Sequence, residues 1–88
     1  MARLELDSPE LLAGGHAGAA DLFYQLGIAY AIGRNVEVDL VAAHKWLNLA
    51  AFRGNAEAAA YRKELSGEMS AGQIAEAQRA AREWLTLH

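Results

Sequence analysis

The stretch GRNVEVDLVAAHKWLNLAAFRGN, residues 33–55, has a glycine at or near each end and a tryptophan inside an alanine-rich run. Glycine readily takes the left-handed conformation that ends a helix, and aspartate is a preferred residue just before one. Gly33 is therefore expected to end a first helix, and Asp39 to cap a second helix over about 39–53 that stops at Gly54. The stretch predicts the corner and second helix of a helical hairpin. The packing face expected on that helix is Leu40, Ala43, Trp46, Leu47 and Ala50.

The segment before this stretch predicts the first helix of the hairpin. Residues 19–32, AADLFYQLGIAYAI, contain only Asp21 and Gln25 as plainly polar side chains. The apolar surface of such a helix extends around most of its circumference, so the helix needs cover on two sides. Residues 1–17 are expected to form a lead-in with at most a short turn of helix, because a pair of glycines interrupts it.

Two more helices are expected after the stretch. Asn55 can cap a third helix over about 56–66, whose apolar stripe is narrow. Ser70 and Gln73 have the spacing of a capping box, so a fourth helix is expected to begin at Ser70. The predicted fold class is therefore all-α, with about four helices.

The composition limits the chain to one small domain of 88 residues with a formal net charge of -3. It has no run of Lys and Arg that would bind a phosphate backbone, so no nucleic-acid partner is expected. It has no cysteine, which excludes disulfides and thiolate metal sites. No apolar run has the length of a signal-peptide core or a membrane span, so we expect a cytoplasmic protein without a membrane partner.

The chain also matches itself. AAHKWLNL at 42–49 and AAREWLTL at 80–87 agree at five of eight positions. Self-similarity at a fixed spacing is the signature of a repeat architecture. We therefore expect tandem antiparallel helical hairpins, with a first repeat at 18–53 and a divergent, capping second repeat at 54–88.

The first repeat carries a spaced pattern of small, aromatic and apolar residues. Its members are Ala20, Leu26, Gly27, Tyr30, Gly33, Val36, Asp39, Ala43, Trp46, Ala50, Ala51, Gly54 and Ala58. This pattern resembles the Sel-one-like repeat, a relative of the tetratricopeptide repeat. Asn35 departs from it, because the family usually has glycine there, and the second repeat has Arg62 and Lys63 in place of the Leu-Gly pair. The resemblance implies an α/α solenoid that acts as an adaptor between proteins in signalling or regulation, including bacterial regulators.

Physical reasons support several positions of this pattern. Gly27 lacks a Cβ where the two helices of the hairpin would come closest. Tyr30 and Trp46 would supply large buried areas, and Val36 is expected to plug the corner against the hairpin. The residues of the first helix expected to pack within the hairpin are Phe23, Leu26, Gly27 and Tyr30.

Another side of the first helix, with Tyr24, Ile28 and Ile32, is left without cover inside the hairpin. By resemblance to tetratricopeptide-type solenoids, this side faces a groove that grips proteins or peptides. The expected function is therefore a non-catalytic protein-interaction module or adaptor. The predicted partner-binding residues are Asp21, Tyr24, Gln25, Ile28, Ile32, Glu57 and Glu64.

Two covers for this side are open at this stage. The leucines at 4, 6, 11 or 12 could fold back onto it, or a second chain could cover it. Two repeats are fewer than usually make a solenoid stable alone, so a homodimer is expected.

Two other functions are compatible with the sequence. Some proteins that resemble this family have been associated with hydrolysis of cell-wall-type or β-lactam substrates, so a hydrolase is the alternative, beside a purely structural self-assembling subunit.

Residue types that carry chemistry are scattered. His16, His44 and His88 lack the spacing of metal ligands and are expected to face solvent. Ser66 and the other serines lie beside turns and helix starts rather than in a nucleophile motif. No catalytic residue, metal or cofactor is therefore expected.

Overall fold

The computed structural model describes residues 18–87, and within that range the chain forms four helices and no strand. The helices are α2 (Gly18–Ile32), α3 (Leu40–Phe52), α4 (Ala56–Ser66) and α5 (Ala71–Leu87). The all-α fold class with four helices is confirmed. The lead-in predicted at 1–17 lies outside the described residues.

The helices begin where the sequence places their caps. The Asp39 carboxylate accepts a hydrogen bond from the Ala42 amide at 3.0 Å, and the Asn55 side chain accepts one from the Ala58 amide at 2.8 Å. Ahead of α5, the Ser70 amide donates to Gln73 Oε1 at 2.9 Å while the Gln73 amide donates to Ser70 Oγ at 3.1 Å. The three predicted caps, including the reciprocal capping box, are confirmed.

The corner between α2 and α3 depends on two left-handed residues, Gly33 with φ of 77° and Asn35 with φ of 63°. Asparagine tolerates this conformation better than other residues that carry a Cβ, so it can stand where the repeat pattern has glycine. The predicted role of Val36 is wrong, because its side chain is 38% exposed. The side chain of Val38 lies beside Gly33, where an added Cβ would be 2.9 Å from Val38 Cγ2, but Val38 is itself 58% exposed, so neither valine plugs the corner.

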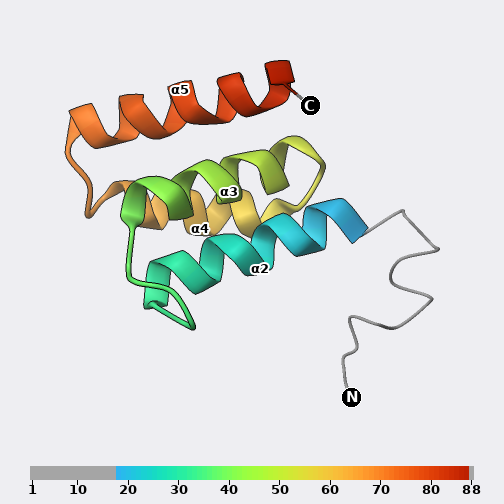
Figure 1. Cartoon of the computed structure of the whole chain (residues 1–88), viewed down its shortest axis with the longest axis horizontal. Helices are drawn as coiled ribbons and strands as arrows, with labels where there is room; N and C mark the ends of the chain where they lie inside the picture. The colour runs from blue at the N-terminus through green and yellow to red at the C-terminus, as the bar shows by residue number, and fades with distance from the viewer. Residues whose placement is uncertain (1–17, 88) are drawn as a thin grey trace.

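The four helices are arranged around α3 (Figure 1), which packs against α2, α4 and α5. In that view α2 and α5 lie on opposite sides of α3, and α4 lies behind it. α2 and α3 form the expected hairpin. α4 and α5 follow each other in the chain but make few contacts, because α5 packs along α3. The second pair of helices is therefore splayed apart.

The core lies where α3 meets its neighbours and consists largely of small side chains. Its fully or almost fully buried members are Ala43, Leu47, Ala50, Ala58 and Leu65. Alanine at three of these five positions lets the backbones of α3 and α4 approach closely. None of the described helices combines the length and the apolar character that a membrane crossing requires.

Candidate functional site

The exposed apolar surface of α2 is formed by Leu22, Leu26 and Ile32, whose side chains are 41%, 40% and 58% exposed. The prediction that Leu26 packs within the hairpin is wrong. α3 approaches α2 at the buried Gly27, and the preceding residue is turned by about 100° around the helix, which carries Leu26 to the side. Leu22 and Leu26 are one helical turn apart and therefore lie side by side.

The residues predicted for a groove on α2 are divided between core and surface. Tyr24 and Ile28 are half-buried, and Tyr24 packs against the core, so it offers less free surface than expected. Ile32 is exposed. Gln25 is exposed as well, and its Oε1 accepts a hydrogen bond from Arg34 Nη2 at 3.2 Å.

The acidic members of the predicted set do not form one border. Asp21 and Glu57 both line a hollow between the start of α2 and the start of α4, together with Arg53. Glu64 is exposed further along α4 and does not line that hollow.

An aromatic cluster joins three helices beside this surface, with Phe23 from α2, Trp46 from α3 and Trp84 from α5. The ring centroids lie 5.4 Å apart for Phe23 and Trp46, 5.2 Å for Phe23 and Trp84, and 5.9 Å for the two tryptophans. Both contacts of Trp84 are edge-to-face, an arrangement that aromatic rings favour. The sequence signal was the matching tryptophan in AAHKWLNL and AAREWLTL, but the repeat assigned the two rings to separate hairpins.

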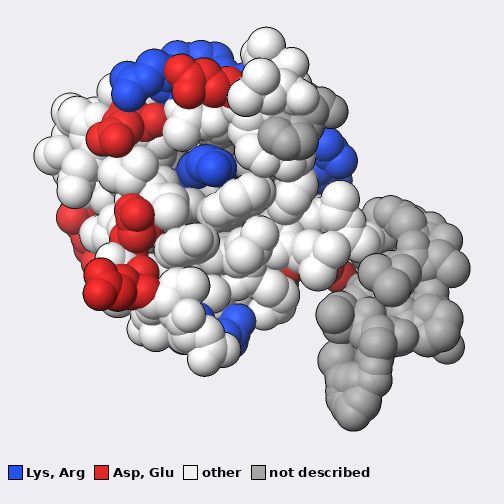
Figure 2. Space-filling view, in the orientation of Figure 1, with Lys and Arg blue, Asp and Glu red and all other residues white. Residues whose placement is uncertain are grey.

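Leu22, Phe23, Gln25 and Leu26 line a shallow hollow of ≈ 450 Å³ that we call the α2 face. Two cations border its aromatic support. Lys45 Nζ lies 4.3 Å from the centroid of Trp46, and the guanidinium carbon of Arg53 lies 5.6 Å from that of Phe23. On the side of the molecule seen in Figure 2, uncharged atoms cover most of the centre and acidic groups gather at the left.

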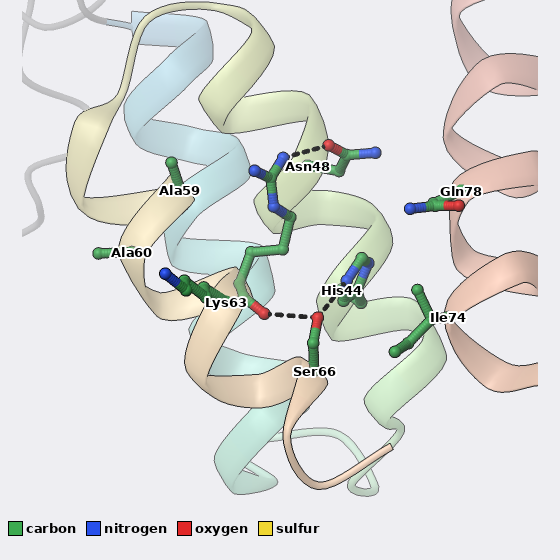
Figure 3. A pocket seen from close by; sticks show the side chains of 9 residues that line it. His44, Asn48, Ala59, Ala60, Lys63, Ser66, Ile74 and Gln78 are labelled. Atoms are coloured by element: carbon green, nitrogen blue, oxygen red, sulfur yellow. Dashed lines mark hydrogen bonds between the residues drawn. The ribbon is translucent and has the colours of Figure 1, made fainter. Parts of the chain in front are cut away.

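A second and more polar pocket opens where α4 and α5 splay apart (Figure 3), and we call it the α4–α5 pocket. Its volume is ≈ 630 Å³. α3 forms the floor, while α4 and α5 form the two walls. The lining residues are His44, Asn48, Ala59, Ala60, Arg62, Lys63, Ser66, Ile74 and Gln78.

His44 is 2% exposed, so the prediction that it faces solvent is wrong. The Ser66 hydroxyl donates to the Arg62 carbonyl oxygen at 2.9 Å, and His44 Nε2 lies 2.9 Å from the same hydroxyl oxygen. Because a hydroxyl has one proton, Nε2 must carry a proton and donate to Ser66. Nδ1 is then an acceptor, and it is buried without a hydrogen-bond partner among residues 18–87. His16 and His88 lie outside the described residues.

This geometry connects α3 to α4 but does not activate Ser66 as a nucleophile. A histidine that acts as the base must accept the serine proton at one ring nitrogen and is oriented by a carboxylate at the other. Here Nε2 donates to Ser66, and no carboxylate of the described residues lines the pocket. The hydrogen bonds of His44 and Ser66 instead hold α3 and α4 together at the floor of the pocket.

The pKa of His44 is lowered below its ordinary value, first by burial and second by the positive charge of Arg62. The unfolded chain therefore binds more protons than the folded chain as the pH falls below about 6.5. We expect the free energy of unfolding to be greatest above about pH 6.5 and to decrease as the pH falls through it. Urea unfolding at about pH 7.5 and about pH 5.5 measures this decrease.

The matched variant for this prediction is His44→Gln, which keeps a polar side chain that does not titrate. The other charged groups that line the pocket are Arg62 and Lys63, and neither is changed in the variant. The decrease in stability should therefore be smaller in the variant. An equal decrease in both proteins would assign the effect to groups other than His44.

Between residues 18 and 87, no group of three or more His, Cys, Asp or Glu side chains is placed to hold a metal ion. Comparison with known proteins gives no match to a protein family, to a curated protein or to a solved structure.

Proposed function

We propose that the chain is a non-catalytic protein-interaction module, an adaptor of the Sel-one-like type that presents a partly apolar helical surface to a protein or peptide. The observation that carries this proposal is the α2 face, where Leu22 and Leu26 are each about two-fifths exposed beside a ring cluster that spans three helices. Neighbouring exposed leucines one helical turn apart offer a continuous contact to a partner.

The support beneath the α2 face favours binding. Phe23 contacts both tryptophans, which also contact each other, so its position is supported before a partner arrives. A surface that is ordered in advance loses less conformational entropy on association. Lys45 and Arg53 add charge at the edge, which gives the arrangement of an apolar centre with a polar rim that is common in protein interfaces.

The first partner to test is a second copy of the chain, because the α2–α3 hairpin is followed by two splayed helices, and a solenoid with so few paired helices usually needs further cover. We expect sedimentation to show a concentration-dependent dimer, and Leu26→Asp to weaken it at least about tenfold. A carboxylate at this position would have to lose its water on association, which costs more than the apolar contact returns. A monomer at every concentration would contradict the homodimer, and the next partner to test is another protein.

If the partner is a different protein, the test is its quantitative capture from native extract by the wild type and by three variants. Leu26→Asp changes the α2 face, Ile28→Asp changes the half-buried side expected from the sequence, and Ala75→Asp adds the same charge to an exposed position of α5. We expect a partner that is retained by the wild type and by Ala75→Asp and lost with Leu26→Asp. Equal retention by all variants would refute the α2 face. Loss with Ile28→Asp alone would move the interface to the groove expected from the sequence.

A further inference from the structure

The α4–α5 pocket contains a cation that has no counter-ion among residues 18–87. Arg62 is half-buried, and its Nη1 donates to Asn48 Oδ1 at 2.6 Å. Its other N–H groups have no protein partner within the described part of the chain. In that same range the ion pair formed is between Arg79 and Glu83, which lies on the exposed surface of α5.

The absence of acidic groups from this lining is unusual for this chain. The sequence has 11 Asp and Glu residues against 8 Lys and Arg, yet the lining contributed by the described residues includes two cations and no carboxylate. The remaining polar lining is uncharged or neutral: Asn48, Ser66, Gln78 and a histidine whose charged form is disfavoured. A partly desolvated guanidinium in such surroundings attracts an anion more strongly than one in open water.

The pocket is also larger and less polar than a simple ion site requires. Its volume is ≈ 630 Å³, and Ala59 of α4 and Ile74 of α5 contribute apolar surface on opposite walls. Lys63 stands at the outer edge of α4, and in Figure 3 its side chain points away from His44 and Asn48. The half-buried cation of the pocket is therefore Arg62, whereas Lys63 is exposed.

We propose that the α4–α5 pocket binds an amphipathic carboxylate, whose carboxyl group pairs with Arg62 and whose apolar stem lies between Ala59 and Ile74. The planar guanidinium matches a carboxylate in shape and can donate two parallel hydrogen bonds to it. A single half-buried cation balances the single charge of a carboxylate. A phosphate dianion would keep part of its charge uncompensated there, because Lys63 lies at the rim. This pocket is separate from the α2 face and does not rest on the function proposed for it.

Binding of a carboxylate has a consequence for His44 that ordinary surface binding would not have. The carboxylate offsets the positive charge of Arg62, which is one cause of the lowered pKa of His44. The pKa of His44 should therefore rise when the pocket is occupied. By linkage, the same probe should bind more tightly as the pH falls toward the pKa of His44.

The experiment follows the imidazole resonances of His44 by NMR during titration with hexanoate, and with hexanamide as the neutral control of the same shape. We expect a saturable shift with hexanoate, a raised His44 pKa at saturation, and neither effect with hexanamide. Equal responses to both probes, or no response to hexanoate, would overturn the proposal.

Two peptide probes distinguish the sources of the carboxylate. They are acetylated tripeptides that end in leucine, one with a free C-terminal carboxylate and one with a C-terminal amide. Tighter binding of the free acid than of hexanoate identifies a peptide C-terminus as the preferred form, and weaker binding identifies a small organic acid. Binding of both peptides with equal affinity would contradict a site that reads the carboxylate.

Three variants locate the binding. Arg62→Gln should weaken hexanoate binding at least about tenfold, and Arg82→Gln, which removes the same charge from an exposed position of α5, should leave it unchanged. Gln78→Glu places a carboxylate at the exposed wall of the pocket and should also weaken binding, with little risk to folding. An equal loss with Arg82→Gln would show a general charge effect and overturn the site. Leu26→Asp should bind hexanoate normally, which separates this test from that of the α2 face.

Discussion

Gly27→Leu should lower the free energy of unfolding by about 3 kcal/mol, because the two helices of the hairpin leave no space for a side chain there. A Cβ added at Gly27 would lie 2.6 Å from Leu47 Cδ2 and 2.7 Å from Leu47 Cγ. Leu47 is fully buried, and the backbone carbonyl of Ala43 limits the other direction at 3.3 Å. Neither α2 nor α3 can move without opening the core. Urea unfolding followed by circular dichroism measures the loss.

The control is another helical glycine, Gly72→Ala in α5. The heavy atom nearest to an added Cβ there is Ser70 Oγ at 3.9 Å, an ordinary contact. Alanine is the better helix former by up to about 1 kcal/mol, so this variant should be as stable as the wild type or more stable. Gly27→Ala should be less stable than the wild type despite the same gain in helix propensity. A Gly27→Leu variant as stable as the wild type would contradict the close approach of α2 and α3.

Features that depend on neighbouring residues were predictable from the sequence. The caps at Asp39, Asn55 and Ser70 follow from side chains that reach an amide three residues away. The close contact at Gly27 follows from one short hairpin, since the corner fixes which faces of α2 and α3 can meet. Both kinds of feature are decided within about one helical hairpin of sequence.

The position of α5 was not predictable in the same way. The similarity of its tryptophan motif to that of α3 indicated a second hairpin with α4, yet α5 packs along α3. The apolar stripe of α3 or that of α4 could have covered α5, and the sequence pattern alone does not decide between these two helices. The aromatic contacts of Trp84 with Phe23 and Trp46 decide between them, and they join residues far apart in the chain.

The two candidate sites also differ in how far the sequence predicts them. The splay of α4 and α5 creates the α4–α5 pocket, and His44 is buried at its floor beside Ser66 of α4, so neither feature could be inferred while α4 and α5 were expected to pair. The sequence predicted an uncovered apolar surface on α2, but not at the residues that form the α2 face. Periodicity showed that α2 has more apolar surface than one neighbour covers, but the choice between Tyr24 and Leu26 depends on a rotation of the helix by less than half a turn.

Trp84→Ala should remove the main anchor of α5 and lower the free energy of unfolding by about 3 kcal/mol. Its ring makes edge-to-face contacts with Phe23 and Trp46, and α5 makes its principal helix contact with α3. Hydrogen exchange should therefore quicken most in α5, while the amides of the α2–α3 hairpin stay better protected. Trp84→Phe should keep part of the ring contact, so its free energy of unfolding should lie between those of Trp84→Ala and the wild type.

Leu87→Ala is the control for this prediction, because Leu87 lies near the end of the same helix and its side chain is exposed. The free energy of unfolding of this variant should be within about 0.5 kcal/mol of the wild-type value. Uniformly faster exchange across all four helices in Trp84→Ala would contradict a local anchor and show that α5 unfolds only with the whole domain. Release of α5 would also remove Ile74 and Gln78 from their wall of the α4–α5 pocket. Trp84→Ala should therefore weaken hexanoate binding although Trp84 does not line that pocket, which tests the anchor and the site through one structural element.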